Sequence, residues 1–204
     1  MATRKRTAPQ EALPEELVTG SVEETQAFGE RLGRALRAGD VVALFGELGS
    51  GKTTLIQGIA QGLGRDAARI KSPTFVLMRE YPPVPSGQGA ARPGDREGRA
   101  GGAGGGTPLV HIDGYRLSGA PAAAWLDIEQ IFSPHKITLI EWAERFEGLL
   151  PASYVGVRLR HVSAHRRAIT VAAHGARAEE IARVAQAAAS VEQPAPSADG
   201  KDST

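Results

Sequence analysis

The sequence contains no cysteine among its 204 residues, so disulfide bonds and thiolate zinc sites are excluded. It contains no asparagine either, which removes the Asn-Lys-x-Asp motif with which guanine-specific switches usually read their base. No hydrophobic run approaches the length that is needed to span a bilayer. The basic start, Met-Ala-Thr-Arg-Lys-Arg, has no apolar segment behind it and does not match a secretory signal. These absences predict a cytoplasmic protein without a membrane or disulfide partner.

Charge and composition indicate one globular domain with additional polar segments. The formal net charge is +1, which gives no overall attraction to nucleic acid, and 41% of the residues are hydrophobic, which suits a sizeable core. We expect a disordered tail over residues 1–17, the domain over 18–175, and a helix followed by a disordered tail over 176–204. Residues 82–107 are rich in glycine, proline and arginine, which predicts a flexible insertion between two strands.

The most informative segment is an apolar run followed by a glycine-rich loop. Residues 41–45 predict a strand buried on both faces. Residues 46–53, Gly-Glu-Leu-Gly-Ser-Gly-Lys-Thr, fit G-x-x-x-x-G-K-[ST] at every fixed position, and apolar residues from Leu55 to Leu63 then recur at helical spacing. A strand, a glycine loop and a helix in this order are typical of a phosphate-binding site.

The residue types of this loop fit the chemistry of a triphosphate. Glycines let the loop curl so that backbone N–H groups point inward, and the start of the helix adds its positive end. Lys52 is expected to reach the β- and γ-phosphates, and the Thr53 hydroxyl to hold Mg²⁺. The predicted contacts of ATP in this loop are Gly46, Gly49, Ser50, Gly51, Lys52, Thr53 and Thr54.

The remaining periodicity predicts an α/β fold. Ser21 and Glu24 form a capping box at the start of a helix. The segments at 154–160 and 168–172 alternate and predict a C-terminal antiparallel hairpin. Together these patterns predict a P-loop NTPase-like three-layer sandwich with a mainly parallel sheet. Further strands are expected at 76–81, 109–113 and 137–141, and further helices at 121–132, 142–150 and 178–190.

Two acids, Asp113 and Glu141, end apolar strands, where ligands of open α/β sheets bind. Each acid alone is equally well explained as a capping or surface residue, but two of them in a chain with a phosphate loop favour a cation site and a water-orienting group. Pro73 restricts the backbone and presents Thr74 rigidly, which suits a hydroxyl that senses a γ-phosphate or its cation. An ordinary turn explains this segment equally well.

The sequence resembles the TsaE family, the bacterial ATPases of threonylcarbamoyladenosine tRNA modification. The resemblance covers about residues 18–172. It implies that Thr53 and Glu141 bind Mg²⁺, that Asp113 is the second acid beside them, and that Thr74 and Trp142 belong to the nucleotide-dependent site. The matching motifs are G-E-L-G-S-G-K-T-T (46–54), K-S-P-T-F (71–75), H-I-D-G-Y-R-L (111–117) and L-I-E-W (139–142).

The resemblance also implies an adenine position and a cellular role. Adenine is expected near Val22 and near His165 and Arg166. Gly114 stands where the family usually has a bulky apolar residue, which is expected to loosen this loop. The resemblance implies an ATPase with TsaB- and TsaD-type partners, with tRNA involved indirectly. Because no arginine finger is evident in a rigid segment, we expect ATP hydrolysis to be slow in the isolated subunit and to be activated by these partners.

Two other functions remain open at this point. A small-molecule kinase uses the same phosphate loop, but the only candidate lid is the glycine-rich insertion, which would close poorly around a substrate. The third hypothesis is a nucleotide-binding switch or scaffold that does not hydrolyse its ligand.

Overall fold

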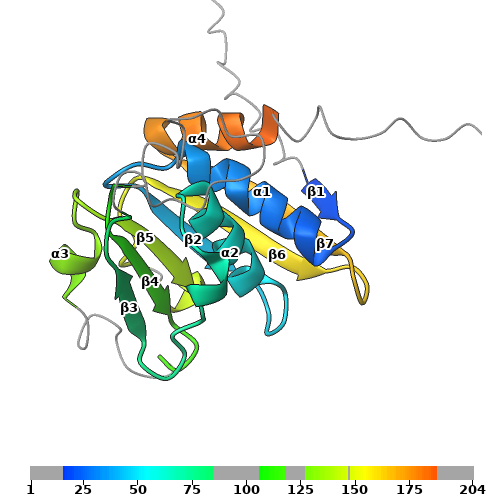
Figure 1. The fold of residues 1–204 in the computed structure, drawn as a ribbon, viewed down its shortest axis with the longest axis horizontal. Coiled ribbons are helices and arrows are strands. Elements are labelled where there is room, and N and C mark those ends of the chain that lie inside the picture. Colours follow the sequence, from blue (N-terminus) through cyan, green and yellow to red (C-terminus); the bar gives the residue numbers. More distant parts are fainter. Residues whose placement is uncertain (1–15, 85–105, 118–126, 147, 188–204) are drawn as a thin grey trace, which may run out of the picture.

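The computed structural model describes residues 16–84, 106–117, 127–146 and 148–187. Within these residues the chain forms a seven-stranded sheet with the order β1-β7-β6-β2-β5-β4-β3 (Figure 1). The strands are β1 (Glu16–Thr19), β2 (Val41–Phe45), β3 (Met78–Tyr81), β4 (Leu109–Asp113), β5 (Ile137–Glu141), β6 (Tyr154–His161) and β7 (Arg167–His174).

The four central strands, β6, β2, β5 and β4, are parallel, and the strands on either side of them are antiparallel. This confirms the predicted parallel sheet and its C-terminal hairpin, which is formed by β6 and β7. β1 was not predicted, because its four residues follow a polar segment and carry too short an apolar pattern. Its first two residues, Glu16 and Leu17, belong to the expected N-terminal tail, and they pair with Thr170 and Ile169 of β7.

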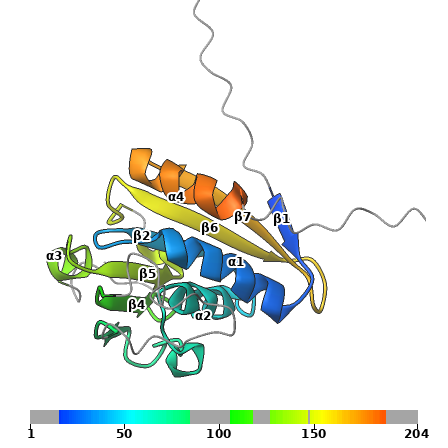
Figure 2. The ribbon, with the colours of Figure 1, turned by 45° about the horizontal axis from the view of Figure 1, so that its top comes forward.

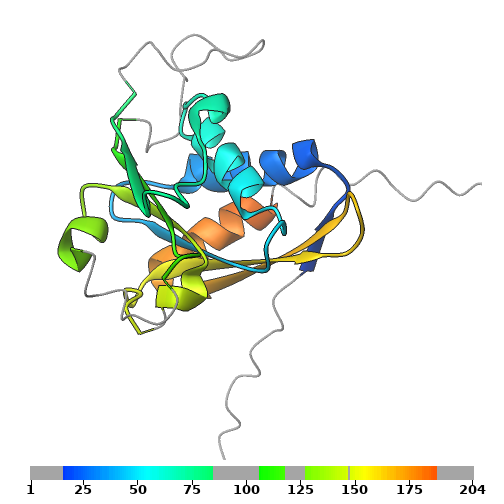
Figure 3. The same cartoon turned by 90° about the horizontal axis from the view of Figure 1, so that it is seen from below.

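Three longer helices, α1 (Val22–Ala35), α2 (Lys52–Gly62) and α4 (Ala176–Ala187), lie on one face of the sheet (Figures 1 and 2). α1 begins as predicted: the Ser21 hydroxyl accepts a hydrogen bond from the Glu24 N–H at 3.1 Å, and the Glu24 carboxylate accepts one from the Gly20 N–H at 2.6 Å. The opposite face of the sheet, at the lower left in Figure 3, carries short elements. These are α3 (Ile128–Ile131) and the 3₁₀ helix η3 (Ala143–Phe146), while a further 3₁₀ helix, η1 (Ala67–Arg69), follows α2.

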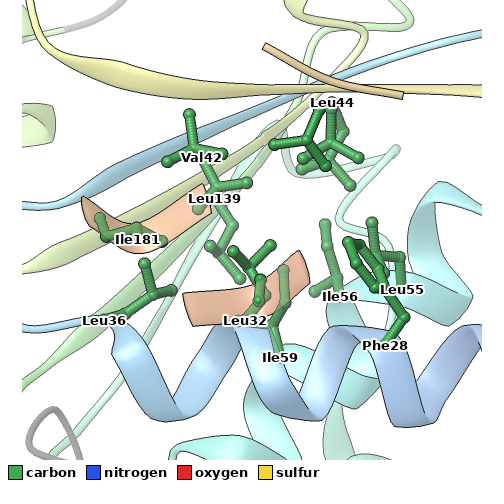
Figure 4. Close-up of a cluster of buried hydrophobic side chains, with 14 of the residues drawn as sticks. Phe28, Leu32, Leu36, Val42, Leu44, Leu55, Ile56, Ile59, Leu139 and Ile181 are labelled. Atoms are coloured by element: carbon green, nitrogen blue, oxygen red, sulfur yellow. The ribbon is translucent and has the colours of Figure 1, made fainter. Parts of the chain in front are cut away.

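Buried apolar side chains form one cluster on each face of the sheet. Val42 and Leu44 of β2 point toward α1 and α2, whereas Val41 and Ala43 belong to the cluster that contains Phe146 of η3 (Figure 4 shows the first cluster). β2 is therefore buried on both faces, as its continuous apolar run predicts.

Glycines allow α1 and α2 to pack with their backbones in contact. A Cβ atom added to Gly33 of α1 would lie 2.2 Å from the Ile59 carbonyl oxygen of α2, and one added to Gly58 of α2 would lie 2.2 Å from the Gln26 carbonyl oxygen. Gly29 and Gly62 make equivalent contacts, at 2.4 Å from the Leu55 oxygen and 2.3 Å from the Glu30 oxygen. Any side chain at these positions would push the two helices apart.

Several predicted boundaries are corrected by the backbone. The expected helix over 142–150 is wrong, because Trp142 has a left-handed backbone (φ 57°) and only the 3₁₀ helix η3 follows it. β3 begins two residues later than the predicted strand 76–81, because the Val76 and Leu77 N–H groups both donate to the Pro73 carbonyl in a turn. α4 begins at Ala176, two residues before the predicted helix over 178–190, and residues 188–190 of that prediction lie outside the described ranges. Of the helix expected over 121–132 the structure describes α3 and its flanking residues, since residues 118–126 also lie outside these ranges.

The two described ends of the glycine-rich insertion are held together by Arg65. Its guanidinium donates to the Pro82 carbonyl and to the Thr107 carbonyl, each at 2.6 Å, and the residue is only 8% exposed. Residues 85–105, on which the prediction of flexibility mainly falls, lie outside the described part of the chain. The bonds of Arg65 fix the points where this segment leaves and rejoins the sheet.

Candidate functional site

The candidate site lies where β2, β5 and β4 end. In the sheet register Glu141 is the neighbour of Leu44 on one side and of Asp113 on the other. Because all three strands are parallel, their carboxyl ends meet at one edge, and the glycine loop that follows β2 lies beside both acids. The predicted pairing of Asp113 and Glu141 at neighbouring strand ends is present in the structure.

The glycine loop has a conformation that needs its glycines. Gly46, Gly49 and Gly51 have φ values of 139°, 74° and 103°, and a Cβ on Gly46 would lie 2.3 Å from the Leu159 carbonyl oxygen. No side chain caps the first turn of α2, which begins after Gly51. The buried Ser50 hydroxyl has no hydrogen-bond partner among the described residues. An uncapped helix start beside an unpartnered hydroxyl suits the oxygen atoms of a bound phosphate.

Lys52 is buried against its own loop. Its ammonium group donates to the carbonyls of Gly46 at 2.7 Å and Glu47 at 2.9 Å, and it lies 4.0 Å from the ring centroid of Trp142. Burial lowers the pKa of Lys52, and the charges of Glu141, Glu144 and Asp113 oppose this effect. The left-handed backbone of Trp142, at the end of β5, places the indole ring over this lysine.

The Glu141 carboxylate is held by side chains from two other segments. The Thr53 hydroxyl, in the first turn of α2, lies 2.9 Å and 3.0 Å from its two oxygen atoms. The imidazole Nε2 of His111, from β4, lies 3.0 Å from Oε1. Both Glu141 and His111 are buried, at 3% and 0% exposure. The threonine and the acid that the sequence predicts as Mg²⁺ ligands are therefore in direct contact.

The Asp113 carboxylate is held by the segment that contains Thr74. Its Oδ2 accepts hydrogen bonds from the Ser72 hydroxyl and, at 2.5 Å, from the Thr74 hydroxyl, while Oδ1 accepts one from the Tyr115 N–H at 2.9 Å. The oxygen atoms of the two hydroxyls lie 2.8 Å apart. Sequence reasoning selected Thr74 but gave no separate role to Ser72, which makes the same contact.

The predicted adenine residues lie on another side of the loop. A pocket of about 290 Å³ is lined by Val22 and His165 together with Gly49, Gly51 and Thr54 of the loop and helix. Arg167 of β7, which sequence reasoning missed, also lines it, and a Cβ on Gly51 would lie 3.8 Å from its Nε atom. Trp142 does not line this pocket and instead contacts Lys52. The structure thus separates the residues predicted for the base from those predicted for the cation.

The donor set fits Mg²⁺ that is shared with a phosphate ligand. Thr53, Glu141 and Asp113 offer oxygen atoms, which this cation prefers. Within the described ranges there is no group of three or more His, Cys, Asp or Glu side chains placed to hold a metal ion. A complete cation site would therefore need oxygen atoms from a ligand, as is usual for Mg²⁺ bound with nucleotide phosphates.

One expectation about this region is wrong. Gly114 was expected to loosen the loop after β4, but a Cβ at this position would lie 2.8 Å from Phe146 Cε2 and 3.0 Å from the Trp142 carbonyl oxygen. The Gly114 N–H also donates to the Glu141 carbonyl at 2.9 Å. Phe146 fills the space that a larger residue would need, so the glycine lets β4 and η3 pack closely.

A sheet with four parallel central strands, a glycine loop between β2 and α2, and two acids at neighbouring strand ends define a protein of the P-loop NTPase-like α/β class. Within the described residues, no helix is both long and apolar enough to cross a membrane.

Comparisons with known proteins identify the family within this class. Residues 19–169 match the family model described as threonylcarbamoyl adenosine biosynthesis protein TsaE. The chain belongs to the TsaE family, which takes part in the biosynthesis of threonylcarbamoyladenosine in tRNA.

Individual relatives agree with this assignment. The chain is 42% identical to a TsaE protein of Streptomyces coelicolor over 57% of its length and 66% of that relative, just under two thirds. It is 32% identical to a TsaE protein of Bacillus subtilis over 79% of its length and 87% of that protein. The crystal structure of Bacillus subtilis YdiB superposes with a TM-score of 0.62 at 27% identity and covers 88% of this chain and 99% of that structure.

Proposed function

We propose that this protein is an Mg²⁺-dependent ATPase that works inside a tRNA-modifying assembly with TsaB- and TsaD-type partners, and that it acts in the cytoplasm. The observation that carries the proposal is the direct contact between Thr53 and Glu141, at the start of α2 and the end of β5. This contact joins the phosphate loop to a buried carboxylate, which is the pairing that a nucleotide-bound cation requires.

The loop residues would bind the phosphates. The N–H groups at the start of α2 and the Ser50 hydroxyl donate to phosphate oxygens, and Lys52 exchanges its bonds with the Gly46 and Glu47 carbonyls for bonds to the β- and γ-phosphates. The Trp142 ring, 4.0 Å from the ammonium group, lies over Lys52 and limits its contact with water. Val22 and His165 contact the base in the pocket beside the loop.

The two acids would have different roles. Glu141 and Thr53 hold Mg²⁺, and Asp113 either holds the same cation or orients the attacking water, with Ser72 and Thr74 fixing its carboxylate. The cation, when bound, neutralises the charge that develops on the transferred phosphoryl group. Asp113 and Thr74 are in direct contact, so a change at the γ-phosphate would reach the segment 72–77, which contains the exposed Phe75.

The experiment that tests this proposal is the ATPase rate at saturating Mg²⁺, with and without the two partners. The wild-type subunit is expected to bind ATP but hydrolyse it slowly, and partners are expected to raise the rate. Glu141→Ala should weaken Mg²⁺-dependent ATP binding, turnover, or both, and Asp113→Ala should impair turnover at least as much as binding. Lys52→Ala should remove ATP binding or turnover while the protein remains folded.

A matched control is Glu80→Ala on the edge strand β3. It removes an ion pair of 2.8 Å between Glu80 and Lys136 and should leave both ATP binding and turnover unchanged. A wild-type rate that is fast in isolation, indifferent to partners and stimulated by a small phosphate acceptor would replace the ATPase proposal with the kinase alternative. If folded Lys52→Ala has the ATP affinity and the ATPase rate of the wild type, the proposed phosphate site is refuted.

A further inference from the structure

His111 is the one histidine that is buried among the described residues. It lies in β4, where every residue from Leu109 to Asp113 is buried, and its side chain is fully inaccessible. An imidazole at such a position must give up water for its two ring nitrogens, whereas leucine would fill a similar volume without that loss. The hydrogen bond between the imidazole and Glu141 compensates part of this loss of hydration.

The hydrogen-bond pattern assigns the form of this imidazole. Nε2 lies 3.0 Å from Glu141 Oε1, and because a carboxylate only accepts hydrogen bonds, the hydrogen atom of this contact belongs to Nε2. Nδ1 is buried and has no hydrogen-bond partner among the described residues. The ring therefore has one hydrogen-bonded nitrogen, Nε2, and this nitrogen is the donor to Glu141.

Glu141 needs such a contact because its other partner has a second task. Thr53 has one hydroxyl hydrogen, and in this structure its oxygen lies 2.9 Å and 3.0 Å from the two oxygens of Glu141. If the Thr53 oxygen turns to a cation, as the proposed function requires, its hold on Glu141 loosens. Of the side-chain hydrogen bonds described for Glu141, only that of His111 does not come from another predicted ligand of the cation.

We infer that His111 is a positioning residue: its Nε2–H fixes the Glu141 carboxylate toward Thr53 and thereby sets the Mg²⁺ dependence of nucleotide binding. The inference rests on the proposed function for its link to Mg²⁺. The hydrogen bond itself is present without nucleotide and can be tested separately.

The first test is the ¹⁵N spectrum of the histidine side chains in the nucleotide-free protein. The chain has five histidines, and the signal of His111 is assigned as the one that disappears in His111→Gln. A hydrogen atom on Nε2 is expected, and Glu141→Gln should shift the Nε2 resonance. An Nε2 that carries no hydrogen atom, or an Nε2 resonance that does not change in Glu141→Gln, would overturn the inference.

The second test compares nucleotide affinity with Mg²⁺ and with a chelator in four proteins. His111→Leu keeps the volume but removes the donor, and it should reduce the gain in affinity that Mg²⁺ provides by about tenfold or more, as is typical for partners of a metal ligand. His111→Gln places an N–H near the position of Nε2 and should restore most of this gain. His135→Leu, at an exposed histidine, is the matched control and should behave as wild type.

The affinity measured with chelator separates positioning from a general loss of structure, because a distorted fold would weaken binding under both conditions. An undiminished Mg²⁺ gain in folded His111→Leu, or an equal loss in His111→Gln and His111→Leu, would refute the positioning role. If His111→Leu fails to fold, His111→Gln and the ¹⁵N spectrum still decide the question. Wild-type affinity that is independent of Mg²⁺ would overturn the proposed function and with it the metal link, while the spectrum alone would then decide whether His111 holds Glu141.

Discussion

Replacing Gly33 with alanine tests whether the glycine contact between α1 and α2 is needed for stability. Intrinsic helix propensity predicts that Gly33→Ala stabilises the protein by about 1 kcal/mol, because alanine loses less conformational freedom in a helix. The structure predicts the opposite sign. The new Cβ would lie 2.2 Å from the Ile59 carbonyl oxygen and 3.0 Å from Ile59 Cα, both backbone atoms that no rotamer change can move.

The expected loss of stability follows from how far the Cβ–oxygen distance falls short of a normal contact. A carbon–oxygen contact needs more than 3 Å, so the helices must separate by close to 1 Å, which disturbs the shared cluster of Leu32, Ile56 and Ile59. Overpacking of this kind costs about 3 kcal/mol at the upper end of its usual range, and the propensity gain of about 1 kcal/mol offsets part of it. The net expectation is a loss of about 2 kcal/mol, or a fall in Tm of about 4–8 °C for a domain of this size.

Thermal and urea unfolding of the wild type and Gly33→Ala measure this loss, with Gly106→Ala as the control, since a Cβ at position 106 meets nothing within 4 Å. The double variant Gly33→Ala with Ile59→Val should be no more stable than Gly33→Ala, because the clash involves the backbone of Ile59 and not its side chain. A stability equal to or above that of the wild type would refute the close contact of the two helices.

Two further predictions concern the segment between β3 and β4. Arg65→Leu should lower the free energy of unfolding, measured by urea titration, by about 2–4 kcal/mol. The substitution removes two charge-assisted hydrogen bonds and leaves the Pro82 and Thr107 carbonyls poorly satisfied. The control Arg34→Leu, at an exposed arginine bonded to Glu30, should lower it by less than about 1 kcal/mol. Deleting residues 84–106 and joining the strands with a short turn should leave stability and ATP affinity nearly unchanged, as measured by melting and calorimetric titration, whereas a folded deletion protein without ATP binding would favour the kinase alternative.

The sequence predicted those parts of the site that depend on contiguous residues. The glycine loop could be recognised because its function requires fixed residue types at fixed spacing over residues 46–53. The pairing of Asp113 with Glu141 was also predictable, because each ends an apolar strand and parallel strands align their carboxyl ends. The capping of α1 by Ser21 and Glu24 could be predicted as well, because it depends on residues that lie close together in the sequence.

The features that the sequence did not predict depend on long-range packing or on backbone conformation. His111 sits inside an apolar strand, and nothing in its neighbours along the chain indicates that Nε2 reaches Glu141. The left-handed backbone of Trp142 ended the predicted helix over 142–150, and residue identity gives no signal for it, because a bulky side chain rarely adopts this conformation. The position of Arg167 in the pocket could not be predicted without the fold of the hairpin, which brings the start of β7 back to the pocket.

The glycine contact of the two helices also determines the geometry of the candidate site. α1 begins at the rim of the pocket with Val22, and α2 begins at the glycine loop with Lys52. The pocket is therefore lined by the first turns of two helices whose backbones touch at Gly33 and Gly58. Thr53 also belongs to the first turn of α2. A shift of this helix would therefore change the distance from Thr53 to Glu141 and the distance from the helix to Val22 at the same time. The close packing of α1 and α2 thus couples the pocket beside the glycine loop to the contact between Thr53 and Glu141, and under the proposed function a glycine substitution far from both should weaken nucleotide binding as well as stability.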